Sequence, residues 1–284
     1  MTAGTRRCTL ETMCGRYVMA RAAGDLVALG GGELPDERLE LRRSWNVAPT
    51  SDVPILLERE ADGAVRRELH VARWGLVPPW AKELAVGSRA FNARSETVAS
   101  KPTFRAAVRA RRCAVPVEGY YEWKAPAPGA KGPDGKAAKK QPYYVHPSGA
   151  GDGEGPVIWF AGLYEWWQDP EAEAAGRDPW VLSTTILTMA APDADDEDEV
   201  LGSLGDLHDR LPVPLDAETM DAWLTPGRLG SAEEADALVG QVCAGAYDVA
   251  AGWVLRPVGT AVGNVRNDGP ELIQAEEPAQ GTLL

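Results

Sequence analysis

The chain has 284 residues and a formal net charge of −13, and 44% of its residues are hydrophobic, which is typical of a globular protein with a full hydrophobic core. Its apolar runs are too short to span a membrane, and its first residues lack the apolar segment of a secretory signal. We therefore expect a cytoplasmic protein with no membrane partner.

Helices are predicted at four places in the chain. Residues 15–30 form the first, residues 104–112 a short basic one, and residues 216–224 a third. The fourth covers residues 231–243 and opens with Ser231 and Glu234 at the spacing of a capping box. Strands are predicted where branched and aromatic residues lie between turn formers, at residues 66–74, 112–123, 142–146, 156–167 and 180–189.

Two segments between these elements read as loops. Residues 124–142 are rich in Pro, Gly and Lys without apolar periodicity, which predicts a flexible surface loop. Residues 191–199 are an acidic run, which we interpret as a solvated connection. Strands and helices do not alternate regularly, so a doubly wound parallel sheet is disfavoured. We expect a single α+β domain with an antiparallel, barrel-like β core and flanking short helices.

Charge is distributed unevenly along the chain. Residues 1–124 carry 20 Lys and Arg against 15 Asp and Glu, whereas residues 125–284 carry 9 against 27. Within the basic half, residues 89–112 hold seven basic side chains and one acid, Glu96. Because local potential steers a ligand, this stretch is a candidate phosphate-binding face. A solvated helix surface is the alternative interpretation.

The four cysteines, at positions 8, 14, 113 and 243, show no C-x-x-C spacing, and the histidines at 70, 146 and 208 do not cluster with them. A zinc site or a disulfide framework is therefore not expected, and we predict neither a metal nor a cofactor.

Eight short segments, several of them with compositions that packing alone does not explain, follow one another in a distinctive order. They are "MCGRY", "WNVAPT", "RWGLVPPWAK", "FNARSET", "RCAVPVEGYYEWK", "ILTM", "LHDRLPV" and "VGNVRNDGPELI". In this order, from Met13 to Ile273, the chain resembles the SRAP family, named for an SOS response-associated peptidase domain and known as sensors of abasic sites in single-stranded DNA. The resemblance implies an extension over residues 1–13 that is absent or removed, an SRAP-like domain over residues 14–275 and a disordered tail over residues 276–284.

The family's residues map onto individual positions of this chain. The resemblance implies an active site of Cys14, Asn92, Glu122 and His208, and DNA contacts from Arg16, Trp74, Arg94 and Arg210. It also implies a crosslinking enzyme with an autopeptidase activity of the hydrolase or lyase type, acting in DNA repair. Its partner would be single-stranded DNA that contains abasic sites, which implies association with the nucleoid if the protein is bacterial, and we expect a monomer.

The chemistry of an N-terminal cysteine agrees with this assignment. A ring-opened abasic deoxyribose presents an aldehyde, which an amine and a thiol one carbon apart capture as a five-membered thiazolidine. Only a cysteine at the N-terminus offers both groups, and its α-amine has a reference pKa of about 7.7 to 8.0. We therefore predict a mature N-terminus at Cys14, reached by translation from Met13 or by self-cleavage after Met13. Cys14 as a small buried hydrophobe is the alternative.

The other site residues admit structural alternatives as well. Glu122 lies between aromatic residues that would desolvate its carboxyl group and favour a proton donor, although a surface strand residue would look the same. His208 suits a proton shuttle or a hydrogen-bonded turn. Asn92 suits an orienting donor or a buried amide that satisfies the backbone.

The tryptophans of "RWGLVPPWAK" and three arginines are expected to bind DNA. Prolines stiffen this segment, and Trp74 or Trp80 could stack on an unpaired base, although core packing is the ordinary role of tryptophan. The arginines at positions 16, 94 and 210 would hold phosphates, so recognition would depend little on sequence.

The chain also departs from the family pattern. The loops at 124–142 and 191–199 look longer than usual, and Ala191 stands where an asparagine is expected. Two other functions stay open: a cysteine peptidase in which Cys14 attacks with His208 as base, and a non-catalytic single-strand binding module.

Overall fold

The computed structural model of the protein describes residues 15–36, 38–132, 134–150 and 155–276. The strands lie at β1 (Tyr17–Met19), β2 (Ser44–Val47), β3 (Asp52–Ala61), β4 (Ala64–Trp74), β5 (Asn92–Arg94), β6 (Arg112–Val117), β7 (Gly119–Lys124), β8 (Gln141–Pro147), β9 (Ile158–Gln168), β10 (Trp180–Ala190), β11 (Arg210–Pro212), β12 (Pro214–Leu215) and β13 (Trp253–Pro257). The α-helices lie at α1 (Ala23–Gly30), α2 (Arg105–Ala110), α3 (Pro170–Ala174), α4 (Glu199–Leu207), α5 (Ala217–Leu224), α6 (Ala232–Ala244) and α7 (Ala246–Ala250).

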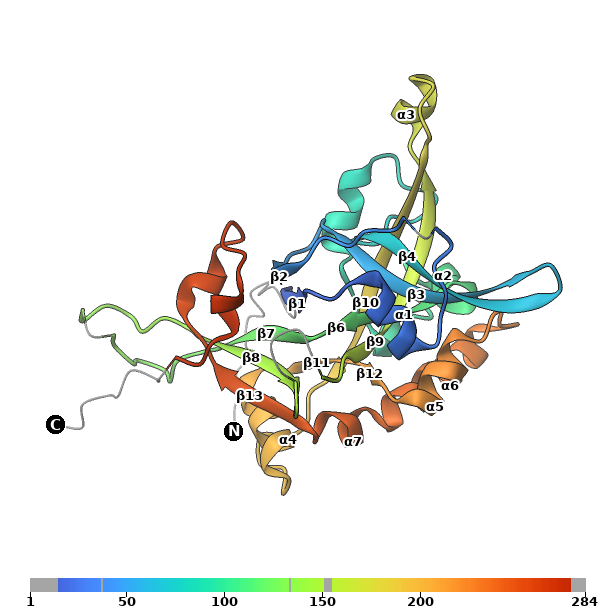
Figure 1. Ribbon diagram of the computed structural model, residues 1–284. Helices are drawn as coiled ribbons and strands as arrows, with labels where there is room; N and C mark the ends of the chain where they lie inside the picture. Colours follow the sequence, from blue (N-terminus) through green and yellow to red (C-terminus); the bar gives the residue numbers. More distant parts are fainter. Residues whose placement is uncertain (1–14, 37, 133, 151–154, 277–284) are drawn as a thin grey trace.

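The strands β4, β3, β6, β9 and β10 form a closed barrel (Figure 1). The barrel closes because β10 pairs on one side with β9, antiparallel, and on the other with β4, parallel. The remaining barrel pairings are antiparallel, and β5 adds a second parallel pairing with β10. The predicted single α+β domain with a barrel-like core is confirmed, with a mixed rather than purely antiparallel sheet.

A second sheet of order β13-β8-β7-β1-β2 carries the N-terminal part of the described chain. It continues directly from the barrel, because only Glu118 separates β6 from β7. The Glu118 carboxylate is 6% exposed, forms an ion pair of 3.3 Å with Arg21, and accepts a hydrogen bond from the backbone N–H of Ala20. A buried ion pair and a hydrogen bond therefore connect the end of β1 to the residue at which the chain passes from the barrel into the second sheet.

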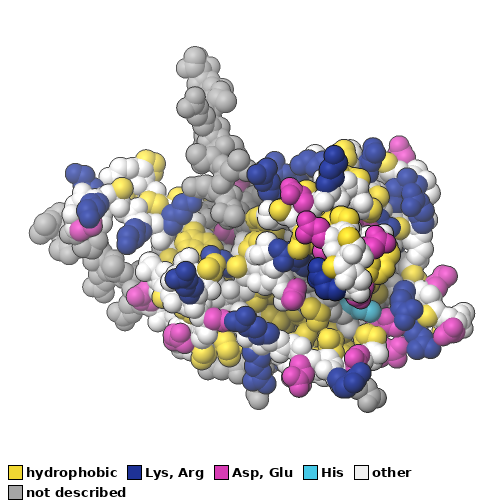
Figure 2. Space-filling model, turned by 90° about the horizontal axis from the view of Figure 1, so that it is seen from above, with side chains coloured by type: hydrophobic (Ala, Val, Ile, Leu, Met, Phe, Trp, Pro, Cys, Tyr) yellow, Lys and Arg dark blue, Asp and Glu magenta, His cyan; other side chains and the backbone are white. Residues whose placement is uncertain are grey.

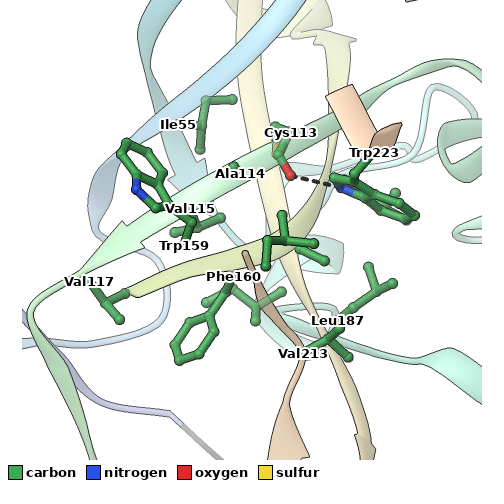
Figure 3. Packing of buried hydrophobic residues seen from close by; sticks show 14 of the residues in the cluster. Ile55, Cys113, Ala114, Val115, Val117, Trp159, Phe160, Leu187, Val213 and Trp223 are labelled. Carbon is green, nitrogen blue, oxygen red and sulfur yellow. Dashed lines mark hydrogen bonds between the residues drawn. The ribbon is translucent and has the colours of Figure 1, made fainter. Parts of the chain in front are cut away.

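The core fills the barrel and the space between the barrel and helix α5 (Figure 3). Every residue of β6 is buried, since β6 is covered on both faces. Trp223 of α5 is fully buried, and its indole N–H donates to the carbonyl oxygens of Cys113 (3.0 Å) and Gly162 (3.2 Å). Trp223 therefore anchors α5 to the barrel, because its large aromatic ring is buried while its indole N–H keeps hydrogen-bond partners.

The predicted helix over residues 15–30 is wrong in its first half. Residues Tyr17–Met19 form β1, which pairs with β7, and the helix begins only at Ala23. All three β1 residues are buried on the second sheet, and this packing outweighs the local helix preference of the segment. Sequence patterns also missed β3, although its long hairpin with β4 supplies the longest pairing in the barrel.

The other predicted helices and strands agree with the structure at their centres. Ser231 caps α6 by accepting a hydrogen bond from the Glu234 N–H, whereas the Glu234 carboxylate reaches back to the N–H of Gly230. The acidic run is a connection as far as Asp198, which caps α4. In the described residues, no helix is both long and apolar enough to cross a bilayer.

Candidate active site

A cavity of about 640 Å³ opens between the second sheet, helix α4 and the C-terminal segment. Its lining residues come from six parts of the chain and are Gly15, Arg16, Ala48, Pro49, Glu122, Trp123, Lys140, His208, Gly263 and Val265. Three residues predicted for the site from sequence, Arg16, Glu122 and His208, therefore meet at one cavity.

Strand register brings the start of the described chain to Glu122. Strand β1 pairs with β7 so that Tyr17 lies opposite Tyr120, and the Tyr121 N–H donates to the Arg16 carbonyl at 2.9 Å. Because the strands are antiparallel, continuing this register places Gly15 level with Glu122. Cys14 itself lies outside the described residues. Its neighbour Gly15 borders the cavity.

The Arg16 guanidinium is fixed at the wall of the cavity. It donates to the Asn46 side-chain oxygen (3.0 Å) and to the Val262 carbonyl (2.9 Å), and burial lowers the pKa of Arg16. The Asn46 amide is 5% exposed and donates to carbonyls of the C-terminal segment, including that of Asn267 at 2.8 Å. These contacts hold the "VGNVRNDGPELI" segment over β2 and complete the cavity wall.

Glu122 presents a buried carboxyl group. Its side chain is 3% exposed on β7, with Tyr143 opposite on β8, and its Oε2 accepts a hydrogen bond of 3.3 Å from the Trp123 N–H. Burial disfavours the charged form of a carboxyl group, and a carboxyl group that holds its proton can donate it. The surface-strand alternative for Glu122 is excluded by this burial.

His208 lies at the C-terminal cap of α4, with its side chain 17% exposed. Its Nδ1 is 3.0 Å from the Arg210 N–H and also 3.0 Å from an Asp209 carboxylate oxygen. The first contact needs an unprotonated Nδ1, with the proton of the neutral ring on Nε2, whereas the second favours a protonated Nδ1. The Nδ1 atom of His208 is therefore within hydrogen-bond distance of one donor and one acceptor.

Asn92 and Arg94 lie on β5 and are not among the residues that line this cavity. Asn92 borders a second cavity of about 510 Å³, together with Arg89 and Lys101. Arg94 is exposed. The described structure therefore does not bring Asn92 into the lining shared by Glu122 and His208.

The basic stretch 89–112 divides into exposed and structural residues. Its exposed members are Arg89, Arg94, Lys101 and Arg105. The other three are used by the fold: Arg109 donates to the Leu229 carbonyl, Arg111 pairs with Glu165 at 2.6 Å, and Arg112 is buried and donates to the Trp223 carbonyl. Four of the seven basic side chains are thus available to a ligand.

The structure places Trp74, which was predicted to contact DNA, in the core. Trp74 is 1% exposed, its ring packs against Tyr17 and Phe91, and its indole N–H donates to the Phe91 carbonyl at 2.9 Å. No face of the indole is open to a base. In contrast, Trp80 in the same motif is 60% exposed.

The predicted phosphate contact from Arg210 also conflicts with its environment. Its guanidinium forms two hydrogen bonds to the Glu96 carboxylate (2.5 and 2.9 Å), donates to the Thr188 carbonyl, and leaves the side chain 11% exposed. The same ion pair lowers the pKa of Glu96. Arg210 therefore ties β11 to β10 and to Glu96, and a phosphate would first have to displace that carboxylate.

Sequence reasoning missed several residues of the cavity. Ala48 and Pro49 belong to the motif "WNVAPT", and Gly263 and Val265 belong to the C-terminal motif. Both motifs supported the family resemblance, but the sequence indicated no role in the site for either of them. Lys140 ends a loop that the sequence presented only as surface. The described residues contain no group of three or more His, Cys, Asp or Glu placed to hold a metal ion.

The chain matches known proteins over most of its length. The family model for SOS response associated peptidase (SRAP) matches residues 13–265. The abasic site processing protein YoqW of Bacillus subtilis is 31% identical over 265 residues, covering 93% of this chain and all of YoqW. The abasic site processing protein HMCES of Rattus norvegicus is 29% identical, covering 95% of this chain and 80% of the rat protein.

Solved structures have the same fold. A protein from Bacteroides thetaiotaomicron superposes with a TM-score of 0.66 at 20% identity, over 93% of this chain and all of its own. A phage-related protein from Bordetella bronchiseptica superposes with a TM-score of 0.55 at 25% identity, over 86% of this chain and 94% of its own. By its sequence and its fold, the chain belongs to the SOS response-associated peptidase (SRAP) family.

Proposed function

We propose that this protein processes abasic sites in single-stranded DNA by binding them covalently through Cys14. The observation that carries the proposal is the position of Gly15, which lines the same cavity as the buried Glu122 carboxyl group and His208. The names of the relatives, abasic site processing proteins, support the choice of substrate. The predicted extension over residues 1–13 would have to be absent or removed for this chemistry.

The proposed reaction joins the aldehyde of the ring-opened sugar to Cys14 with loss of one water. The α-amine adds to the aldehyde carbon, and the resulting carbinolamine loses hydroxide, with a proton supplied by an acid, to leave an imine. The thiol then adds to the imine carbon and its proton moves to nitrogen, which closes the thiazolidine. In this scheme Glu122 donates the proton that departs with the hydroxide, and His208 moves protons during ring opening and reversal.

Abasic DNA would be positioned by charge and stacking around the cavity. Arg16 holds a positive charge at the cavity wall, and Arg94 is exposed on β5. Trp80 is exposed on the segment after β4 and offers a face on which an unpaired base can stack. Phosphate contacts touch the DNA backbone and stacking touches the face of a base, so neither reads the base edges and binding would be tolerant of sequence.

Incubation with single-stranded DNA that contains one abasic site tests the proposal against two alternatives. The proposed function gives an adduct that survives SDS and heat. A cysteine peptidase that uses Cys14 and His208 would instead cleave a peptide substrate in trans. A non-catalytic binding module would give a salt-sensitive complex that SDS dissolves. Equal behaviour with undamaged and abasic DNA would contradict the proposed function.

Arg94→Glu should weaken DNA binding without regard to sequence. A phosphate contact becomes a repulsion, so the slope of log K against log salt should become shallower by roughly 1. Binding is measured by fluorescence anisotropy across salt concentrations. Arg228→Glu, at another exposed position, is the control for net charge. If both variants bind like the unchanged protein at low salt, Arg94 makes no phosphate contact.

Substitution of Trp74 should affect mainly the stability of the protein, whereas substitution of Trp80 should affect mainly DNA binding. Trp74→Phe removes the hydrogen bond to the Phe91 carbonyl and should lower the free energy of unfolding by about 1–3 kcal/mol with DNA affinity unchanged. Trp80→Ala should leave stability nearly unchanged and cost about 1–3 kcal/mol of binding, the usual value of one stacked base. Urea denaturation and anisotropy measure the two effects. Full DNA affinity in Trp80→Ala would show that Trp80 stacks on no base.

A further inference from the structure

The loop between β7 and β8, residues 125–140, stands at the rim of the candidate active site. It begins three residues after Glu122, and its two ends border the cavity through Trp123 and Lys140. In Figure 1 the loop extends away from the sheet, on the left of the view. A DNA strand that enters the cavity along this side would pass the loop.

The loop and its base are strongly basic in an otherwise acidic half of the chain. Residues 124–140 contain five lysines and one acid, Asp134. Lys131, Lys136 and Lys139 are exposed, and the Lys136 side chain is 84% exposed with its ammonium 3.6 Å from Asp134. Neither Lys131 nor Lys139 makes an ion pair within the described residues. Figure 2 shows several basic side chains, Lys or Arg in dark blue, on the projecting part at the left of the view.

The loop has a defined shape in addition to its charge. It folds back on itself in a small hairpin, in which the Ala138 N–H donates to the Ala130 carbonyl (3.0 Å) and the Gly132 N–H to the Lys136 carbonyl (2.8 Å). At its base, Lys124 pairs with Asp206 of α4. Lys131 and Lys136 therefore lie on hydrogen-bonded backbone, which reduces the entropy that binding would cost.

We propose that the loop of residues 125–140 is a second DNA-binding element that contacts phosphates of the strand next to the lesion. The inference rests on the proposed function for the position of that strand. Lysine ammonium groups bind phosphates as point charges and need no further complementarity. A protein partner would need large anchoring side chains, and residues 125–140 contain no aromatic residue and no Leu, Ile, Val or Met.

The test is a triple variant, Lys131→Gln, Lys136→Gln and Lys139→Gln, bound to undamaged single-stranded DNA of about 30 nucleotides, longer than a typical single-domain site. The hairpin is held by backbone hydrogen bonds, so these changes leave its fold intact. Each phosphate contact on single-stranded DNA contributes about 0.7 to the slope of log K against log salt, so loss of three contacts should make this slope shallower by about 2. The affinity at low salt should fall by ~10-fold or more.

The matched control removes three positive charges from other exposed positions, in the variant Arg38→Gln, Arg177→Gln and Arg228→Gln. This control should keep the slope of the unchanged protein. An equal loss of slope in both variants, or an unchanged slope in the lysine variant, overturns the inference. An oligonucleotide of about 5 nucleotides, which fills only part of a typical site, should bind the lysine variant and the unchanged protein alike.

Adduct formation separates this inference from the proposed function. At saturating abasic DNA, the lysine variant should form the SDS-resistant adduct at the rate of the unchanged protein, because none of the substituted lysines lines the cavity. If the unchanged protein forms no adduct but the lysine variant still loses its salt slope, the loop binds DNA and the proposed chemistry is wrong. If adducts form and the slope does not move, only the loop inference fails.

Discussion

Protein that begins at Cys14 should convert abasic single-stranded DNA into an adduct that survives SDS, and protein that retains residues 1–13 should form none through Cys14. The physical reason is the state of one nitrogen. A free α-amine has a pKa of about 7.7 to 8.0 and is partly neutral at pH 7, whereas a peptide nitrogen is not nucleophilic. The intact mass of the adduct and the mass of its N-terminal peptide measure the outcome. We expect the adduct only with the protein that begins at Cys14 and none with the protein that retains residues 1–13.

Two serine variants define which atoms react. Cys14→Ser keeps the amine but not the thiol, so it should give only an imine, trapped by borohydride and lost on dilution without it. Cys113→Ser is the matched thiol control, since Cys113 is fully buried and burial raises its pKa to about 12. An active protein that retains Met1 or Thr2 and crosslinks through Cys14 would contradict the thiazolidine mechanism.

The second large effect is expected for Glu122→Gln, which should slow adduct formation by about 10²- to 10⁴-fold, the usual contribution of a general acid. Amide and acid have similar shapes, so the cavity and the DNA affinity should be retained. Quenched time courses at saturating abasic DNA measure the rate, and anisotropy measures binding. A slower adduct rate in Glu122→Gln is assigned to the chemical step only if the affinity for DNA is unchanged.

Glu118→Gln is the structural counterpart of this variant. Glu118 is also a buried carboxylate beside β7, but it pairs with Arg21 and does not line the cavity. Removing its charge should lower the free energy of unfolding and leave the adduct rate of the folded protein nearly unchanged. If Glu122→Gln crosslinks at the normal rate, Glu122 supplies no proton to the reaction.

Local signals were enough to predict much of the fold. Ser231 before an apolar run marks the start of α6, and the branched and aromatic runs mark β4, β8, β9 and β10, because caps and strand preferences act over a few residues. The ordered motifs also identified the family, which the family match over residues 13–265 confirms. The roles of Cys14, Asn92, Glu122 and His208 stay predictions.

Tertiary structure decided what no local pattern encodes. Trp74 and Trp80 lie six residues apart with the same side chain, yet one is 1% and the other 60% exposed. The ring of Trp74 packs against Tyr17 and Phe91, which other parts of the chain bring to it. Residues 17–19 read as helix and form β1, since pairing with β7 supplies contacts about 100 residues away in sequence.

The sequence by itself determined the family, the helices α2, α5 and α6 with the second half of the predicted first helix, and the strands β4 and β6 to β10. Only the tertiary structure determined that Arg210 is held by Glu96, that Arg109, Arg111 and Arg112 support the fold, and that Lys140 reaches the cavity. The reason is physical: burial and ion pairing depend on which distant segments meet, and strand register in the barrel and the second sheet sets those meetings.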